Sequence, residues 1–225
     1  MFKFTYQTKY KIFKIIRNFF KKFNIHIFYY KEKNYIKEFN PDTIIDVGVA
    51  NGTDFLFNTF PNAKYLFVEP NPEFFSFIEK NLLKKYKAKL FKTAAGNEIG
   101  KRKIKSLGGI STFLQRSDYK LNKEIEVNIS KLDQILKNET LNGINLLKID
   151  TEGFELEVLK GSTETLKKIN YLIIELRLEN IDTYNPSEIF NFLYGNSFVF
   201  FKIMKIRYTK NGISVMDVIF KKIKL

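Results

Sequence analysis

The nine residues IIDVGVANG, 44–52, decide the fold of this chain. A short apolar run ends at Asp46, and two glycines, Gly48 and Gly52, follow before a segment with helical character. Glycine permits a tight turn and lets a ligand approach the backbone, while the N-terminus of the next helix offers N–H donors and a positive dipole. The stretch therefore predicts a buried strand, a glycine turn and a helix that together form a ligand-binding turn.

A carboxylate follows this turn at a distance typical of nucleoside-binding sites. Glu69 lies near the end of the next apolar run, 64–70, and 21 residues after Gly48. An acidic residue about 20 residues beyond such a turn is the expected acceptor for ribose hydroxyls. The glycines lack the Gly-x-Gly-x-x-Gly spacing, which argues against a nicotinamide cofactor. A plain strand-to-helix turn without a ligand is the alternative.

Predicted strands and helices alternate along the chain from Thr43 onward. The strands are 43–48, 64–70, 88–94, 125–130, 145–150 and 171–177, and the helices are 53–59, 72–85, 131–137, 154–168 and 186–195. Apart from the strand 125–130, residues 95–130 are expected to be irregular, since turn signals dominate there. The alternation predicts an α/β fold with a doubly wound, mostly parallel sheet. The pair Asn211-Gly212 predicts a terminal β-hairpin, which makes one strand antiparallel.

Composition excludes several kinds of site. The chain has no cysteine and a single histidine, His26, so disulfides, thiolate-bound metals and zinc sites built on histidine pairs are excluded. We expect no resident metal and a cytoplasmic protein. The first 30 residues contain no signal-peptide pattern, and no run approaches the roughly 18 apolar residues of a membrane-spanning helix.

Residues 1–40 form a basic extension before the predicted domain, 41–225. Ten Lys/Arg and two Glu give this extension +8 of the chain's net charge of +14. Within 9–24, apolar residues fill one arc of a helix and cations fill the opposite arc. Such a helix either packs on the domain as a cap, which we favour, or lies weakly on the anionic inner face of a membrane. Only five of the 38 basic residues are Arg, so we expect no nucleic-acid partner.

Five blocks of the sequence resemble the FkbM family of methyltransferases. They are DVGVANGTD (46–54), FVEPNPEFF (67–75), TAAGNEIGK (93–101), GGISTF (108–113) and LLKIDTEGFELEVLKGS (146–162). Their order and spacing match the family over about 42–180, and the Ile-Asp-x-Glu-Gly-x-Glu segment followed by Leu-Lys-Gly is the most specific part. The family often carries Asp-x-Gly-Ala-Asn-x-Gly, whereas Asn51 lies one place later here.

The resemblance implies a seven-stranded class I, Rossmann-like methyltransferase fold that binds S-adenosyl-L-methionine. The residues that it assigns to the cofactor are Asp46, Gly48, Asn51, Gly52, Glu69, Asn71, Ala94 and Ala95. Asp46 and the two glycines would surround the methionine part, Glu69 would accept from the ribose hydroxyls, and one of the alanines would lie against adenine. This assignment agrees with the rule that ligands bind beyond the carboxyl ends of parallel strands.

A second group of carboxylates marks a candidate acceptor site. Asp150 ends the strand 145–150, Glu152 follows it, and Glu175 lies near the end of 171–177. At this edge the three could hold an acceptor hydroxyl or take its proton, so we assign them as candidate catalytic residues. The alternative is structural: Glu152 would interact with the dipole of the next helix, and Glu175 would pair with Lys148 or Arg177.

Two further features receive weaker assignments. Glu155 and Glu157 are expected to lie on a helix in solvent. Ser111 and Thr112, in the GGISTF block, either donate to a sugar or phosphate acceptor or belong to an ordinary turn.

The function implied is S-adenosylmethionine-dependent O-methylation of a sugar, a cell-surface glycan or a related small molecule. The alternative is a catalytically inactive methyltransferase fold that binds a membrane or RNA through residues 1–40. The joint presence of Gly48, Gly52, Glu69 and Asp150 argues against that alternative. A sugar-nucleotide dehydrogenase is disfavoured because no nicotinamide fingerprint is present.

Overall fold

The computed structural model describes residues 36–106, 123–179, 184–210 and 212–223, the backbone of 111–112, and positions 14, 15, 18 and 22. The chain divides into two units, 1–35 and 36–225. Most of the predicted helix over 9–24 lies outside the described residues, and the predicted boundary at residue 40 stays a prediction. The elements that position the candidate site all belong to the second unit.

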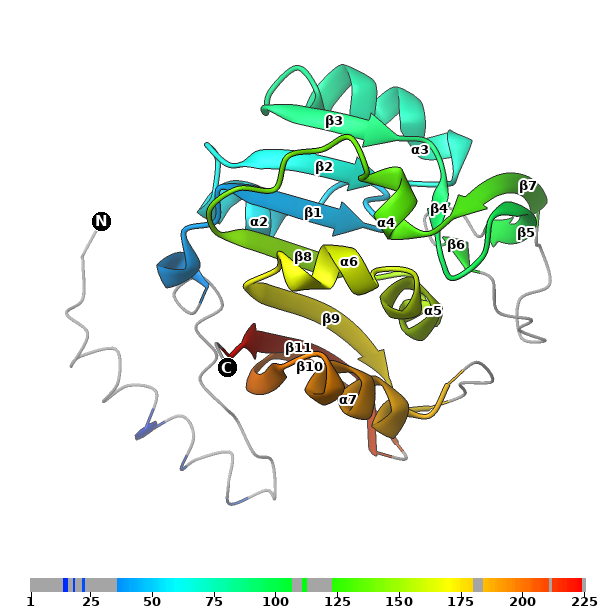
Figure 1. Cartoon of the computed structure of the whole chain (residues 1–225). Coiled ribbons are helices and arrows are strands. Elements are labelled where there is room, and N and C mark those ends of the chain that lie inside the picture. The colour runs from blue at the N-terminus through cyan, green and yellow to red at the C-terminus, as the bar shows by residue number, and fades with distance from the viewer. Residues whose placement is uncertain are drawn as a thin grey trace. The chain divides into compact units, whose positions relative to one another are not determined.

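A seven-stranded sheet forms the centre of the second unit, with the strand order β10-β11-β9-β8-β1-β2-β3 (Figure 1). Its strands are β1 (Thr43–Val47), β2 (Lys64–Val68), β3 (Ala88–Phe91), β8 (Asn145–Ile149), β9 (Tyr171–Arg177), β10 (Phe198–Thr209) and β11 (Gly212–Lys222). Strand β11 is antiparallel to both of its neighbours, and the remaining pairs are parallel. The predicted mostly parallel sheet with a terminal hairpin is confirmed.

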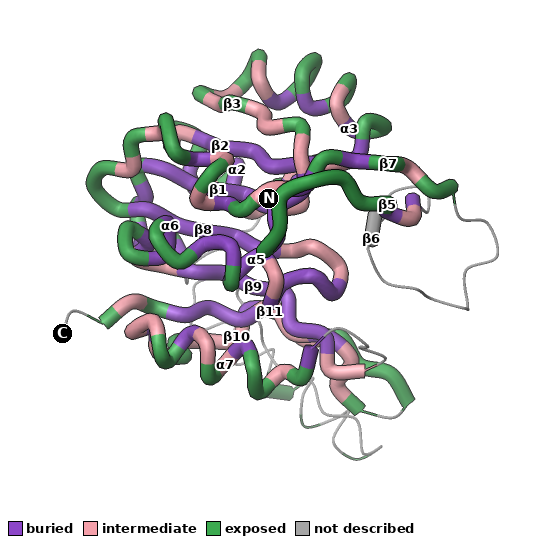
Figure 2. Tube along the Cα trace, turned by 45° about the vertical axis from the view of Figure 1, so that its right-hand side comes forward, coloured by how far each residue is buried: buried purple, intermediate pink, exposed green. Residues whose placement is uncertain are grey.

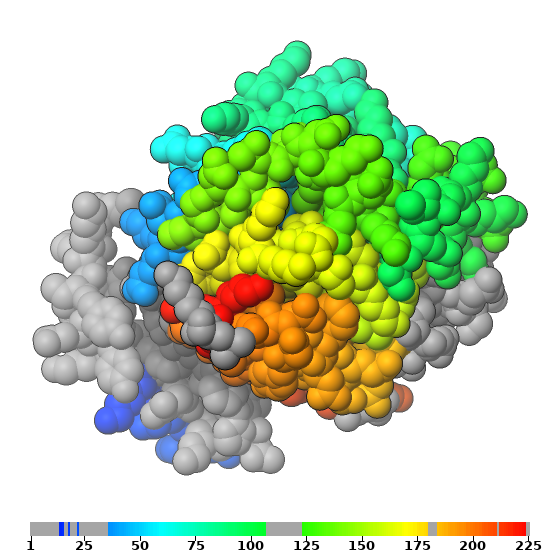
Figure 3. All heavy atoms as spheres, viewed as in Figure 1, coloured from blue at the N-terminus to red at the C-terminus, as the bar shows by residue number. Residues whose placement is uncertain are grey.

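Helices cover both faces of this sheet. One face carries α4 (Leu132–Ile135), α5 (Glu155–Lys160), α6 (Thr163–Lys167) and α7 (Pro186–Gly195), which lie in front of the sheet in Figure 1. The opposite face carries α2 (Asp54–Thr59), α3 (Pro72–Phe77), the π-helical turn η3 (Ile78–Leu82) and the 3₁₀ turn η2 (Lys37–Phe39). In Figure 3, the yellow segment with α6 and the orange segment with α7 are both seen on the outside of the first face. The doubly wound arrangement is confirmed.

Each face of the sheet has its own hydrophobic core. Successive residues of a strand point to opposite faces, so Ile45 packs in the first core and Ile44 in the second. All five residues of β1 and of β8 are buried, as Figure 2 shows in purple. Near-continuous apolar strands are typical of parallel sheets that are covered on both faces, which is why these two strands were predictable.

The segment 154–168, predicted as one helix, forms the two helices α5 and α6. The chain between them passes so close to β4 (Ala94–Ala95) that a Cβ on Gly161 would lie 1.9 Å from the carbonyl oxygen of Gly96. A residue without a side chain is therefore required where the helix breaks. The predicted helix 72–85 is similarly divided into α3 and η3.

A second, four-stranded sheet occupies 94–130, where irregular chain was expected apart from the strand 125–130, which is confirmed as β7 (Lys123–Ser130). It is ordered β4-β7-β5-β6 and also contains β5 (Gly100–Ser106) and β6 (Ser111–Thr112). Cross-strand ion pairs join β5 to β7, among them Lys101 with Glu126 at 2.9 Å and Lys103 with Glu124 at 3.1 Å. The expectation was wrong because the sequence GKRK gives no apolar alternation. Figure 1 shows this sheet beside the carboxyl ends of the central strands.

Among the residues that the structure describes, no helix has the length and apolarity needed to cross a membrane.

Candidate active site

The turn after β1 depends on glycine at two positions. Gly48 has φ +85° and Gly52 has φ +102°, values that other residues rarely adopt. A Cβ on Gly48 would lie 1.8 Å from the carbonyl oxygen of Asp150. The amide of Asp150 also donates to the carbonyl of Val47 at 3.0 Å. The glycine turn and the loop after β8 are therefore in direct contact, so the two predicted sites are neighbours.

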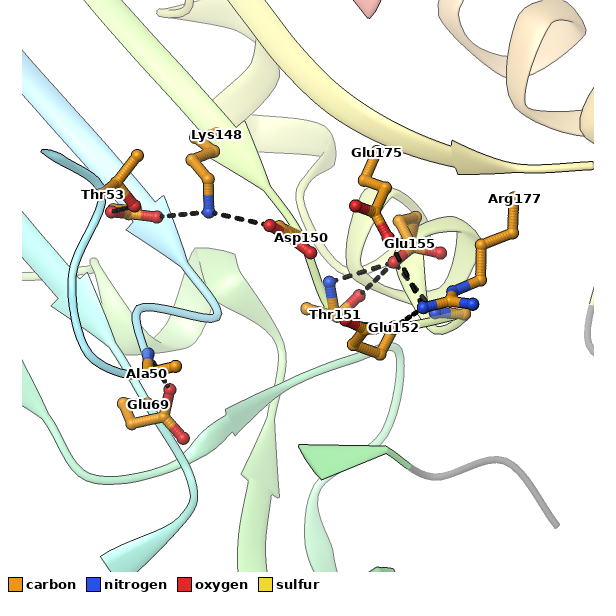
Figure 4. A network of polar contacts seen from close by, with 12 residues as sticks. Ala50, Thr53, Glu69, Lys148, Asp150, Thr151, Glu152, Glu155, Glu175 and Arg177 are labelled. Atoms are coloured by element: carbon orange, nitrogen blue, oxygen red, sulfur yellow. Dashed lines mark hydrogen bonds and ion pairs between the residues drawn. The ribbon is translucent and has the colours of Figure 1, made fainter. Parts of the chain in front are cut away.

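The carboxylate of Glu69 holds the same turn from the end of β2. Glu69 is 2% exposed and accepts hydrogen bonds from the backbone N–H groups of Ala50, at 2.8 Å, and Asn71, at 2.9 Å. Figure 4 shows the Ala50–Glu69 contact at one side of the site. Burial raises the pKa of Glu69 and outweighs the lowering by the two N–H donors. Each carboxylate oxygen accepts one backbone hydrogen bond, so capacity remains for ligand hydroxyls.

The other residues assigned to the cofactor have different surroundings. Asn71 is fully buried, caps α3 by accepting from Glu73 N–H at 3.0 Å, and donates to the hydroxyl of Ser106 at 3.2 Å. Ser106 ends β5, so this bond ties the four-stranded sheet to the loop after β2. The alanines 94 and 95 form β4, which pairs with β7. Asn51 is exposed on the glycine turn.

Asp46 lies inside the sheet and is bound by two polar groups. It is fully buried, accepts from the Thr53 hydroxyl at 2.7 Å, and forms an ion pair with Lys148 at 3.1 Å. Lys148 in turn lies 3.4 Å from the carboxylate of Asp150, as Figure 4 shows. Burial raises the pKa of Asp46. Burial would lower the pKa of Lys148, but Asp46 and Asp150 outweigh it and the pKa is raised.

The predicted catalytic carboxylates come together at the edge of the sheet. Asp150, Glu152 and Glu175 each place one oxygen within 4.8 Å of the others. Arg177 of β9 contacts Glu152 and lies 3.6 Å from Glu175 (Figure 4), and Arg207 of β10 also contacts Glu175. Such a group could bridge a divalent cation, but the two arginines already supply positive charge, so we assign no metal here.

Burial makes Glu175 unusual among these groups. It is 6% exposed, and burial raises its pKa to about 8, with the charge of Asp150 adding to the effect and that of Arg207 opposing it. The structural alternative had Glu175 paired with Lys148 or Arg177, and Arg177 is the partner found. Asp150 is the most accessible of the three carboxylates, with 34% of its side chain exposed, against 20% for Glu152 and 7% for Glu175.

The expectation that Glu155 lies in solvent was wrong. Glu155 is fully buried, and one of its oxygens accepts from the N–H groups of Thr151 and Gly153, both at 3.0 Å, and from the Thr151 hydroxyl at 3.1 Å. The Tyr184 hydroxyl also bonds to this carboxylate and accepts from the N–H of Arg177. Burial raises the pKa of Glu155. Glu155 therefore holds the loop that carries Asp150 and Glu152.

Sequence reasoning missed Glu155 and Arg207 as parts of the site. It named Lys148 only as a partner of Glu175, whereas Lys148 pairs with Asp46 and Asp150. A lysine inside the apolar run NLLKI was a usable signal, because an ionised group in a fully buried strand needs a partner. Helical periodicity misled the assignment of Glu155, since the loop before α5 turns back onto its first residue. Nothing in the sequence near Arg207 indicated that it would contact Glu175.

Strand β11 is inserted between β9 and β10, and with the glycine turn after β1 this topology is that of a class I S-adenosylmethionine-dependent methyltransferase. The particular family follows from the sequence: the family described as "Methyltransferase FkbM domain" matches residues 46–200. The chain belongs to the FkbM methyltransferases, and its methyl donor is S-adenosyl-L-methionine.

The chain is similar to a curated relative and to solved structures. The hexuronic acid methyltransferase AglP of Haloferax volcanii is 29% identical over 143 residues, which cover 60% of this chain and 56% of that protein. The chain thus matches little more than half the length of that relative. The fibrillarin pre-rRNA processing protein of Methanococcus jannaschii has a TM-score of 0.51 at 12% identity, with coverage of 81% of this chain and 67% of that chain. An uncharacterized protein of Listeria monocytogenes serotype 4b gives 0.50 at 11% identity, covering 88% and 70%.

Proposed function

We propose that this methyltransferase O-methylates a hydroxyl group of a sugar, a cell-surface glycan or a related small molecule. The observation that carries the proposal is the position of Asp150, a part-exposed carboxylate that follows β8 and contacts the glycine turn of β1 through its backbone. The similarity to a hexuronic acid methyltransferase supports a sugar acceptor.

The residues at the ends of β1 and β2 fit the cofactor. S-adenosylmethionine supplies a methyl group that is already activated by the positive charge on sulfur. The glycine turn gives its methionine part close access to the backbone, since Gly48 and Gly52 carry no side chain. Glu69 retains acceptor capacity for two ribose hydroxyls beside its bonds to Ala50 and Asn71. We propose Ala94 and Ala95 as neighbours of adenine.

Asp150 is the proposed proton acceptor for the sugar hydroxyl. The single histidine of the chain precedes the domain, so a carboxylate is the natural base. An aliphatic hydroxyl that loses its proton late in the displacement does not require a strong base. The Lys148 ammonium lies 3.4 Å from the Asp150 carboxylate, and Glu152 and Glu175 lie beside it. The remaining task of the site is to position the two reactants and exclude water.

A radiolabelled methyl-transfer assay tests the proposal. Full-length protein is incubated with labelled S-adenosylmethionine and a panel of cell-envelope glycans, nucleotide sugars and RNA, with Asp150→Asn, expected to transfer more slowly, as the matched variant. Label in a sugar fraction, stable to mild base that cleaves methyl esters, supports O-methylation of a hydroxyl. Label only in RNA, or only in base-labile esters, contradicts it. No transfer to any acceptor, despite cofactor binding, favours the inactive binding module instead.

We further propose a cytoplasmic location, with weak, salt-sensitive binding of residues 9–24 to an anionic membrane surface as a secondary role. Their cations would each add up to about 1 kcal/mol near anionic lipid. Liposome sedimentation with and without anionic lipid tests this. Equal binding by the full chain and by a truncation starting at Asn40 contradicts a membrane role for the segment.

A further inference from the structure

Ser106 of β5 joins the four-stranded sheet to the loop after β2. It is 4% exposed, although it ends a strand whose first four residues are all exposed. In the register of the sheet, Ser106 pairs with Ser111 of β6 and with Lys123 of β7. The side chain of Ser106 is therefore presented from a position where all three strands pair.

The hydroxyl of Ser106 forms hydrogen bonds with two residues around the start of α3. It donates to the carboxylate of Glu73 at 2.7 Å and accepts from the side-chain amide of Asn71 at 3.2 Å. A hydroxyl has one hydrogen, so the donation to Glu73 makes the Ser106 oxygen the acceptor for Asn71. The bond from Ser106 is the first cause of the lowered pKa of Glu73, whose carboxylate also lies 3.4 Å from the Lys123 ammonium.

Asn71 connects Ser106 to the carboxylate of Glu69. The backbone N–H of Asn71 donates to one oxygen of Glu69 at 2.9 Å, and the N–H of Ala50 donates to the other. The side chain of Asn71 is held by the N–H of Glu73, at 3.0 Å, and by the hydroxyl of Ser106. Asn71, Ser106 and Glu69 are all buried, so solvent does not replace a bond that is lost between them. The direction of the N–H that meets Glu69 thus depends on a residue of the other sheet.

We propose that Ser106 is a positioning residue for the cofactor, which acts through Asn71 to hold Glu69 in the orientation that accepts the ribose hydroxyls. The inference rests on the proposed contact between Glu69 and the ribose. It makes recognition of the ribose depend on the attachment of the four-stranded sheet. The alternative is a structural bond that attaches this sheet to α3 without acting on Glu69.

Two ligands separate positioning from attachment: S-adenosylhomocysteine and an analogue of it that lacks both ribose hydroxyls. In Ser106→Ala the affinity for S-adenosylhomocysteine falls by about 5-fold, the usual effect of one lost hydrogen bond, whereas the affinity for the analogue keeps its wild-type value. In the Glu69→Ala background, Ser106→Ala causes no further loss, because the carboxylate through which it acts is absent. The control Ser214→Ala removes a hydroxyl that donates to the Arg207 carbonyl at 3.2 Å in the hairpin, and it leaves both affinities unchanged.

Calorimetric titration of the full chain measures these affinities without requiring a known acceptor. An equal loss for both ligands, no loss for either, or an undiminished further loss in the Glu69→Ala background overturns the inference, while the assignment of Glu69 stands.

Glu73→Ala provides a second variant if Ser106→Ala does not fold. The side chain of Glu73 is 40% exposed, and its removal takes away the acceptor of the Ser106 hydroxyl. A loss of affinity for S-adenosylhomocysteine but not for the analogue supports the inference, and any other result overturns it. Wild-type protein that binds both ligands equally contradicts the ribose contact of Glu69 itself and overturns the inference with it.

Discussion

The two halves of the site differ in whether backbone or side chains set their geometry. At the ends of β1 and β2, the geometry is set by backbone: two left-handed glycines, the N–H of Ala50 and the N–H of Asn71, with Glu69 as the carboxylate they bind. At the ends of β8 and β9, beside Arg207 of β10, it is set by side chains, where carboxylates alternate with the cations of Lys148, Arg177 and Arg207.

This difference has a consequence for substitutions. Backbone geometry tolerates no added atom, so changes in the first half should act on cofactor binding and stability. A charged network can lose one member and keep its shape, so changes in the second half should act on turnover and pH dependence. The predictions below test this division, beginning with the largest expected effect.

We expect Gly48→Ala to abolish cofactor binding and to lower the free energy of unfolding by about 3 kcal/mol or more, since the new Cβ combines backbone strain with a clash. That Cβ would lie 1.8 Å from the Asp150 carbonyl oxygen at φ +85°. Urea unfolding and calorimetric titration with S-adenosylhomocysteine measure the two effects. The matched control is Gly195→Ala in α7, where a Cβ meets nothing within 4 Å. Comparable stability of both variants would show that the glycine turn is not rigid.

We expect Asp150→Asn to lower kcat by roughly 100-fold, as the loss of a positioned proton acceptor does. Affinity for S-adenosylhomocysteine should stay within a few-fold, because Asp150 contacts the cofactor turn through its backbone, which the substitution keeps. Steady-state kinetics on the identified acceptor, with isothermal titration beside it, separates the two. A variant that turns over normally would give Asp150 a structural role and would weaken the proposed division.

We expect Glu69→Ala to weaken cofactor binding by about 1–3 kcal/mol, the usual effect of leaving buried donors without a charged acceptor. The substitution strands the N–H groups of Ala50 and Asn71 and removes the proposed acceptor of the ribose hydroxyls. Calorimetric titration checks the affinity, and Glu79→Ala, which removes an exposed ion pair with Lys92, is the control. Unchanged affinity in Glu69→Ala would remove this carboxylate from the cofactor site.

The same division explains what could be predicted from the sequence. Gly48, Gly52 and Glu69 were identified because backbone turns impose residue types at fixed spacing, and the central sheet because buried parallel strands are continuous apolar runs. Of the four-stranded sheet only β7 was predicted, because its partner β5 carries charged residues on its surface and pairs through ion pairs. No local sequence pattern predicts strand pairing through such ion pairs.

The side-chain half of the site was only partly predictable. Asp150 and Glu175 were found because each stands at the end of an apolar strand. Their partners Lys148 and Arg207 come from the inside of β8 and from the hairpin, and which charges meet there depends on strand order and register. Glu155 was assigned to solvent because its helix position looked exposed, whereas the loop in front of it folds back onto its carboxylate.

The smallest effect that we expect in the side-chain half is on the pH dependence of the free energy of unfolding. The folded protein raises the pKa of Glu175 from its usual 4.5 to about 8, so between these values the folded state holds a proton that the unfolded state has lost. Unfolding then releases a proton, and the contribution of Glu175 to stability falls as pH rises through this window. We expect Glu175→Gln to remove that decline.

The expected difference between wild type and Glu175→Gln is on the order of 1 kcal/mol across the window, because Glu175 shares its proton with neighbouring carboxylates. Urea unfolding at several pH values between about 4.5 and 8 measures it. The control Glu126→Gln changes an exposed carboxylate and should follow the wild-type curve at a constant offset. If Glu175→Gln also parallels wild type, Glu175 is ionised in the folded state at neutral pH, fully neutralised by Arg177 and Arg207. The side-chain half would then be a set of fixed ion pairs. It would differ from the backbone half only in the groups that set its geometry.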